Sequence, residues 1–160
     1  MPGHGEPHLG PMSEHVATVT WTTGSEPFTY DTFSRAHALA PGSGGVIAAS
    51  AAAEFHGDPG RTNPEELLVG ALASCHMLTF LSVAARKRLA VVRYEDRAVG
   101  TLAKNEEGRL AVTDVVLTPK VEFGEGVAVS TEELRKLHDL AHRNCFIASS
   151  VRCRVRIDLG

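Results

Sequence analysis

The sequence predicts an α+β domain, and three observations lead to that class. The predicted elements follow the order strands, helix, hairpin of strands, second helix and final strand. No internal repeat or low-complexity segment interrupts this order. A chain of 160 residues suits one domain with a real hydrophobic core. We expect that domain over residues 14–160, after a flexible tail at residues 1–13 that is rich in Gly, Pro and His.

The first elements are predicted to be short strands. Residues 15–21 alternate in the way that indicates a strand. A Thr-Gly-Ser turn and a second short strand around residues 28–30 then indicate a hairpin. Residues 46–49 follow a cluster of glycines and are predicted to form another strand, and the polar loop at residues 57–62 leads into a helix.

The first helix has a clear start and an unusual composition. Asn63 is a favourable N-cap, Pro64 suits the first helical position, and two glutamates follow at the positive end of the helix dipole. Residues 67–85 carry no charge and are apolar on all sides, which predicts burial in a core, an interface or a membrane. The run is long enough for a bilayer, but its Gly, Ser, Cys, His and Thr residues favour a buried central helix. No membrane association is predicted.

The second half of the chain contains a hairpin, a helix and a strand. Residues 91–104 and 110–122 are rich in β-branched residues, and the turn-rich segment between them predicts a long antiparallel hairpin. Ser130 and Glu133 form a capping box, which predicts a helix with one apolar stripe up to about Asn144. Residues 151–159 alternate as a half-buried strand, so Cys153 is predicted to point into the core and to be dispensable.

Charge and cysteine content narrow the function classes. The formal net charge is −3 and the basic residues are scattered, which excludes a broad basic face for nucleic acid. Three cysteines without a recognisable signal peptide argue against a secreted disulfide scaffold. A reducing, cytoplasmic location is therefore predicted.

Cys75 and Cys145 are the candidates for redox chemistry, with a small buried hydrophobe as the alternative for Cys75. Cys75 lies well inside its helix, where the helix dipole lowers a thiol pKa little, so a reactive Cys75 needs a nearby cation. A carboxylate at the helix start, such as Glu65, can hold an arginine in a bidentate contact. Arg35 and Arg61 are the candidates for that arginine.

Histidines near the cysteines suggest two further roles, both weakly. His138 and His142 share a helical face that leads to Cys145, but this is only part of a typical metal-ligand set and no Cys-x-x-Cys is present. No metal is predicted. His76 follows Cys75 directly, and neighbours on a helix point about 100° apart, which disfavours direct pairing of the two side chains.

Three motifs resemble the OsmC/Ohr family of thiol peroxidases, the osmotically inducible and organic hydroperoxide resistance proteins. They are Asn-Pro-Glu-Glu-Leu-Leu at residues 63–68, Ala-Leu-Ala-Ser-Cys-His at 71–76 and Asn-Cys-Phe-Ile at 144–147. The likeness extends from about residue 15 to 158. It implies an OsmC-like fold, in which antiparallel sheets wrap around long central buried helices in an intertwined homodimer with active sites at the subunit interface. Such a dimer would explain a helix that is apolar on every face.

The resemblance also implies a mechanism. Cys75 would be the peroxidatic cysteine, whose thiolate attacks the O–O bond and becomes a sulfenic acid. Cys145 would be the resolving cysteine and would form a disulfide with Cys75. An external dithiol, with the lipoyl type as a candidate, would reduce that disulfide, and no bound cofactor is implied. Glu65 would hold an arginine against the Cys75 sulfur; Arg35 resembles that arginine and Arg61 is its rival.

The expected activity is reduction of organic hydroperoxides, and less effectively of hydrogen peroxide, to alcohol and water in the oxidative stress response. The organic-hydroperoxide branch usually has proline after the second cysteine, whereas Phe146 stands here, which places the chain nearer the OsmC-like branch. Met77, Phe80 and Phe146 are expected to line an apolar substrate pocket or to be plain core. Two alternatives stay open: a non-enzymatic dimer that binds small apolar ligands, and a cysteine hydrolase or transferase that uses Cys75 with His76 or His142.

Overall fold

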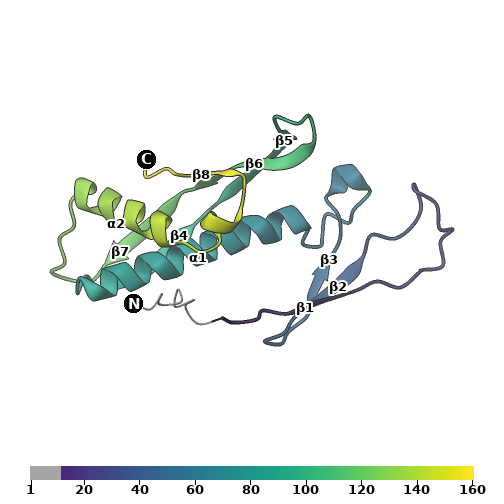
Figure 1. The fold of residues 1–160 in the computed structure, drawn as a ribbon. Coiled ribbons are helices and arrows are strands. Elements are labelled where there is room, and N and C mark those ends of the chain that lie inside the picture. The colour runs from purple at the N-terminus through teal and green to yellow at the C-terminus, as the bar shows by residue number, and fades with distance from the viewer. Residues whose placement is uncertain (1–11) are drawn as a thin grey trace, which may run out of the picture. The chain divides into compact units, whose positions relative to one another are not determined.

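A computed structural model describes residues 12–160, which form two compact units divided after Thr62. The N-terminal unit contains a small sheet, and the C-terminal unit contains both long helices and the remaining strands (Figure 1). The predicted mixture of helices and strands is confirmed. Most of the predicted tail, residues 1–11, lies outside the described residues, and the prediction of a single domain over residues 14–160 stays a prediction.

The N-terminal unit is a three-stranded antiparallel sheet in the order β1-β2-β3. Its elements are β1 (Ala17–Thr20), β2 (His37–Pro41), β3 (Ile47–Ala49) and the short 3-10 helix η1 (Ala53–Phe55). The predicted strands at residues 15–21 and 46–49 are confirmed as β1 and β3. The hairpin partner of β1 is β2, and not the segment around residues 28–30.

The predicted strand around residues 28–30 is wrong because this segment turns back on itself. The backbone N–H groups of Thr32 and Phe33 both donate to the carbonyl oxygen of Thr29, at 3.2 and 3.0 Å. Phe28 and Phe33 pack against each other and against Trp21 in tilted and edge-on arrangements, with ring centroids 5.5 to 6.4 Å apart. Phe28 therefore belongs to an aromatic cluster around a turn, which holds the chain away from extended geometry.

Helix α1 (Pro64–Arg86) begins as predicted. The Asn63 side chain accepts from the Glu66 N–H at 2.9 Å, and the Glu66 carboxylate accepts from the Asn63 N–H at 3.1 Å. This reciprocal capping box satisfies two backbone donors. At the other end the Leu89 N–H donates to the Ala84 carbonyl at 2.9 Å, while Arg88 has a φ of 59°. These contacts form a Schellman motif, which ends the helix firmly.

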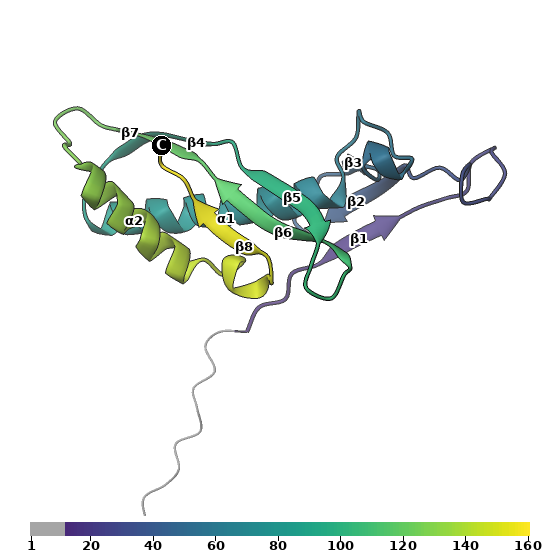
Figure 2. The same ribbon diagram turned by 90° about the horizontal axis from the view of Figure 1, so that it is seen from above.

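The rest of the C-terminal unit contains two sheets and helix α2 (Thr131–Asn144), which lies along α1 (Figure 2). One sheet pairs β4 (Val91–Asp96) with β7 (Pro119–Phe123), and the other has the order β5 (Val99–Lys104), β6 (Leu110–Leu117) and β8 (Arg154–Ile157). The predicted hairpin is confirmed for β5 and β6, and β8 adds to β6 in parallel. Each predicted arm is divided into two strands.

The division of the hairpin arms has a local cause. Asp96 Oδ1 accepts a hydrogen bond from the Thr118 N–H at 2.8 Å, and the Thr118 hydroxyl donates to the Arg97 carbonyl at 2.8 Å. Side chains thus replace the ladder bonds at this point. The two arms continue beyond it in different sheets.

One face of α1 forms the core of the C-terminal unit. Its buried residues recur at helical spacing: Leu72, His76, Phe80, Val83 and Ala84. They pack in two clusters, one against α2 and one against β6, and the half-buried Cys153 packs against the second cluster. This agrees with the predicted orientation of Cys153.

The opposite face of α1 is exposed, although it carries no charge between Glu66 and Arg86. Its exposed positions there are Gly70, Ala71, Ser74, Leu78, Ser82 and Ala85. Burial of this face would need contact with another molecule, and it stays a prediction. By length and composition α1 is long and apolar enough to cross a membrane, a property that core helices share.

A histidine pair joins the two helices within the core. His76 Nε2 lies 3.0 Å from His138 Nδ1, and the two rings are nearly parallel with centroids 5.3 Å apart. Phe80 stacks on His138 at 4.3 Å. Both histidines are 1% exposed, and burial lowers the pKa of each from 6.5 to about 4. Both rings are consequently neutral at physiological pH.

We predict that this pair makes the fold sensitive to acid. Between pH 6.5 and 4 the unfolded histidines bind protons that the folded ones do not, so stability falls as the pH falls. The loss should be on the order of 3 kcal/mol for each of the two histidines between pH 7 and pH 4. Urea unfolding at a series of pH values measures it. The double variant His76→Phe/His138→Phe should flatten the profile, and an unchanged acid slope in that variant would contradict the assignment.

Candidate active site

Cys75 lies in the middle of α1 and is half-buried. It lines a cavity of about 570 Å³ whose other walls come from the second half of α1, the end of α2 and Phe146. The hydroxyl of Thr79, one turn further along α1, donates to the Cys75 carbonyl at 2.8 Å. Cys75 thus combines a rigid helical backbone with a sulfur that faces an open space.

Cys145 is the residue at which α2 ends. Its N–H donates to the His142 carbonyl at 3.2 Å, and its side chain is 1% exposed. The Ala148 N–H donates to the Cys145 sulfur at 3.5 Å, within the short turn that leads into η2 (Ala148–Ser150). The turn after α2 therefore places a backbone N–H donor beside the Cys145 sulfur.

The two thiols are free, and each shifts the pKa of the other, so the two side chains are close neighbours. Burial raises the pKa of the Cys75 thiol, but hydrogen bonds from the Ile147 and Phe146 N–H groups and from Cys145 together lower it below its ordinary value. Burial and the neighbouring Cys75 raise the pKa of Cys145. The hydrogen bond from the Ala148 N–H acts in the opposite direction but does not outweigh them. Cys75 is therefore the thiol that ionises first, and thiolates are the nucleophilic form.

The C-terminal unit supplies a source of this activation that the sequence did not suggest. A cation was expected beside Cys75, whereas in the C-terminal unit the backbone of Phe146 and Ile147 supplies hydrogen-bond donors. Sequence reasoning missed the donor roles of Ile147 and Ala148, because every residue except proline has a backbone N–H and the residue type does not show which of them will donate. The irregular segment directly after Cys145 was the only available signal.

Of the three predicted pocket residues, one lines the Cys75 cavity. Phe146 is 82% exposed and forms part of its wall. Phe80 is fully buried in the core against His138, and Met77 is half-buried and is not a wall residue. The reason is helical geometry: positions 76 and 80 face α2, and the cavity follows positions 75, 78, 79 and 82.

Glu65 lies in the first turn of α1 but takes no part in the capping box, which uses Glu66. Its Oε2 is buried and has no hydrogen-bond partner among the described residues. A buried carboxylate oxygen without a donor is costly, and a guanidinium is the donor that best matches it. Glu65 is thus free to bind a cation.

The candidate arginines both lie in the N-terminal unit, where each has local contacts. Arg35 donates to the carbonyl oxygens of Phe33, at 2.6 Å, and Tyr30, and its guanidinium lies 3.6 Å from the centre of the Phe33 ring. Arg61 lies 3.4 Å from Asp58. The assignment of either arginine to the site stays a prediction.

The histidines offer little support for metal or hydrolytic chemistry. Among residues 12–160 no group of three or more His, Cys, Asp or Glu side chains is arranged to hold a metal ion. His76 is held in the core by its hydrogen bond to His138, pointing to α2. That orientation disfavours His76 as the base for Cys75.

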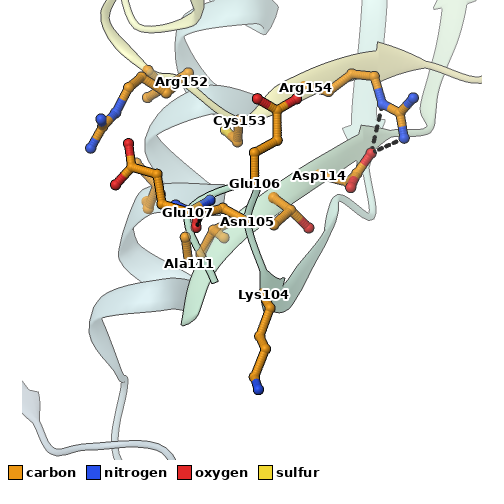
Figure 3. A pocket seen from close by; sticks show the side chains of 13 residues that line it. Lys104, Asn105, Glu106, Glu107, Ala111, Asp114, Arg152, Cys153 and Arg154 are labelled. Atoms are coloured by element: carbon orange, nitrogen blue, oxygen red, sulfur yellow. Dashed lines mark hydrogen bonds and ion pairs between the residues drawn. The ribbon is translucent and has the colours of Figure 1, made fainter. Parts of the chain in front are cut away.

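Cys153 lies in a separate hollow of about 770 Å³ (Figure 3). The hollow has charged walls of both signs, including the ion pair of Arg154 and Asp114 at 2.6 Å, and Lys104 extends away from Cys153. Burial raises the pKa of Cys153, which keeps it in the less reactive thiol form. Nothing in this setting gives Cys153 a part in the chemistry of Cys75.

Comparisons with known proteins agree with the geometry. A family model described as OsmC-like protein matches residues 56–160. An OsmC-like protein of unknown function from Vibrio cholerae is 46% identical, with a TM-score of 0.88 over 92% of this chain and 99% of that one. A comparison with curated proteins found no match.

More distant structures share the fold. An organic hydroperoxide resistance protein from Elizabethkingia anophelis is 16% identical, with a TM-score of 0.70 over 95% of this chain and 100% of that chain. A putative organic hydroperoxide resistance protein from Vibrio cholerae is 21% identical, with a TM-score of 0.68 over 96% of each chain. At such low sequence identity, these comparisons show a shared fold and nothing more specific.

We predict that Cys75 is alkylated at lower pH than Cys145 and that backbone donors are the reason. Phe146→Pro removes one N–H donor and should raise the pKa of Cys75 towards its ordinary value. Phe146→Ala keeps the N–H and should leave the pKa unchanged. Iodoacetamide alkylation across pH, followed peptide by peptide with mass spectrometry, measures both thiols. Earlier alkylation of Cys145 in the unaltered protein would refute the assignment.

Proposed function

Because the chain belongs to the OsmC-like family, we propose that it is a cysteine-based peroxidase that reduces organic hydroperoxides to alcohols. One observation carries the proposal: at the wall of a cavity, a thiol of lowered pKa is the close neighbour of a second, buried thiol. The names of the distant hydroperoxide resistance proteins support the same reaction class.

The reaction begins at Cys75. Its thiolate attacks the terminal oxygen of the hydroperoxide, the O–O bond breaks, and the alkoxide takes up a proton to leave as the alcohol. Cys75 is then a sulfenic acid. The Cys145 thiol loses its proton and attacks the Cys75 sulfur, which forms a disulfide and releases water. An external dithiol, for which the lipoyl type is our candidate, reduces the disulfide by thiol exchange.

The cavity walls favour an apolar peroxide. Leu78, Val83, Leu140 and Phe146 present aliphatic and aromatic surface beside Cys75. Apolar contact of this kind favours a hydrocarbon group next to the O–O bond, and hydrogen peroxide has none to offer. Organic hydroperoxides should therefore react faster than hydrogen peroxide.

Glu65 and an arginine complete the proposed site. Glu65 has a buried oxygen in need of a donor, and a guanidinium bound there would stabilise both the thiolate and the peroxide oxygen. We assign this role to Arg35, with Arg61 as the alternative. Neither a cofactor nor a metal is required by this chemistry.

The working form is proposed to be a cytoplasmic homodimer, with active sites at the subunit interface. Two surfaces support a dimer: the uncharged exposed face of α1, and the large hydrophobic side chains that the N-terminal unit exposes. The latter are Val16, Val19, Trp21, Phe28, Tyr30, Val46 and Phe55. Apolar surface on this scale marks contact with another molecule. No nucleic acid or membrane partner is proposed.

A non-enzymatic binder of apolar ligands is the second candidate, and the cavity beside Cys75 favours it equally. The two candidates differ in the thiols. A binder has no need of a lowered Cys75 pKa, and its ligand would leave both thiols reduced.

We predict a Cys75–Cys145 disulfide after treatment of reduced protein with cumene hydroperoxide. Peptide mapping by mass spectrometry identifies the bridge, and a coupled dithiol assay gives turnover. Cys75→Ser should abolish turnover. Cys153→Ser, the matched control, should leave it within about twofold because Cys153 lines a hollow separate from the Cys75 cavity and serine is close to cysteine in size. A treated protein without this bridge would rule out the two-cysteine mechanism.

We also predict that the protein sediments as a dimer. The expected mass is twice the 17.1 kDa of the chain. Val19→Asp places a charge on the exposed apolar strand β1 and should shift the equilibrium towards monomer. Glu14→Gln, just before that strand, is the control and should not. A monomer in the unaltered protein at all concentrations tested would contradict the dimer.

A further inference from the structure

A polar pair lies in the otherwise apolar contact between α1 and α2. The hydrogen-bonded rings of His76 and His138 are each 1% exposed, and Phe80 stacks on the His138 ring. The buried cluster around this contact consists of aliphatic and aromatic side chains: Phe80, Val83, Ala84, Leu137 and Ala141. Both histidines therefore occupy positions where an apolar side chain would fill the core as well.

The pair also has a cost in stability. Its hydrogen bond uses His76 Nε2 and His138 Nδ1, and the remaining ring nitrogens of both residues are buried without a hydrogen-bond partner among the described residues. When both rings are neutral, one of these two nitrogens carries a hydrogen with no acceptor. Replacement of both partners of a buried hydrogen bond by apolar groups of similar shape can be neutral or stabilising. Stability therefore does not account for two histidines at this contact.

The hydrogen bond supplies direction, which the apolar cluster does not. Apolar contacts are non-directional, so they would let one helix shift along the other with little loss of buried area. A hydrogen bond weakens steeply when its distance and angle change, and this one joins the two nitrogens at 3.0 Å. A buried polar contact can thus select one alignment among several that apolar contacts allow. We infer that the pair fixes the alignment of α1 with α2.

Both reactive thiols are attached to the backbone that this pair aligns. His76 directly follows Cys75 in α1, and His138 lies seven residues before Cys145, about two turns of α2. A shift of one helix along the other would therefore move the two cysteines relative to each other. A disulfide tolerates little movement of this kind, because the Cβ atoms of bridged cysteines lie about 4 Å apart.

We propose that His76 and His138 are positioning residues for disulfide formation, and that they hold the Cys145 sulfur in place to attack the Cys75 sulfenic acid. The proposal rests on the proposed peroxidase function and concerns its second step. In that step the Cys145 sulfur bonds to the Cys75 sulfur, the S–O bond breaks, and the thiol proton of Cys145 leaves with the hydroxide as water. Neither histidine takes part in these bond changes, and their effect on the rate comes from orientation.

A single-turnover experiment measures the two steps separately. The full chain, reduced and freed of dithiol, receives one equivalent of cumene hydroperoxide at a pH above the ordinary thiol pKa, so that Cys75 is ionised in every variant. Loss of hydroperoxide reports the first step. Appearance of the Cys75–Cys145 disulfide, mapped by mass spectrometry after an acid quench, reports the second. Urea unfolding gives the stability of each variant.

The variants separate positioning from stability. His76→Phe/His138→Phe should be at least as stable as the unaltered protein and lose hydroperoxide at a similar rate, yet form the disulfide about tenfold more slowly. His138→Asn, whose amide takes the place of Nδ1, should keep the disulfide rate although it loses the stacking on Phe80 and is less stable. Val121→Ala, the matched control, shortens a side chain on the same cluster and should lower stability alone.

Two results would overturn the proposal while the peroxidase function stands: an unchanged disulfide rate in the double variant, and disulfide rates that follow the stability of the variants. Loss of folding in the double variant would also count against it, because the pair would then be needed for the fold itself. Hydroperoxide that leaves Cys75 of the unaltered protein unoxidised would overturn both the proposal and the peroxidase function.

Discussion

The hydrogen-bonded contact between Cys75 and the turn after α2 is the interaction on which the chemistry depends. Cys75 is fixed by the middle of a 23-residue helix, and Cys145 by the end of a second helix. The two sulfurs meet because α1 and α2 pack on each other through Phe80 and Leu137 and through the His76–His138 pair. The core thus sets the separation of the thiols, and the turn at residues 145–148 decides which of them ionises.

This arrangement assigns different tasks to two chemically identical groups. Cys75 accepts hydrogen bonds and faces a cavity, so its thiolate is favoured and accessible. Cys145 is buried and lies beside Cys75, and both features raise its pKa and favour its thiol form. Environment alone sets the order of the two steps in the proposed reaction. Cys153 lacks both features and stays outside it.

Local signals in the sequence predicted the helices and the central hairpin well. The Asn63 cap, the Ser130 cap and the turn before Leu110 each involve only a few neighbouring residues. The local structure that each one forms therefore depends little on the rest of the chain. The segment around residues 28–30 was misread because its aromatic residues, which favour strands, cluster with Trp21 instead. The break at Thr118 depends on side-chain contacts across the hairpin, which periodicity does not report.

The candidate site was predictable in its cysteines and not in its surroundings. Motifs identified Cys75, Cys145 and Glu65, whereas the donors at Phe146 and Ile147 belong to the backbone. Phe80 was expected in the pocket because it lies near Cys75 in sequence, but the helical turn directs it to α2. The cavity beside Cys75 is lined by α1 positions three and four residues apart, which only the packing of α2 turns into a cavity.

The most direct test of the central claim is to trap the first intermediate. A Cys145→Ser variant, which cannot form the disulfide, is treated with one equivalent of cumene hydroperoxide in the presence of dimedone, a reagent for sulfenic acids. The account predicts a dimedone adduct on Cys75 and one equivalent of cumyl alcohol. Unmodified Cys75 with the hydroperoxide still intact would contradict it.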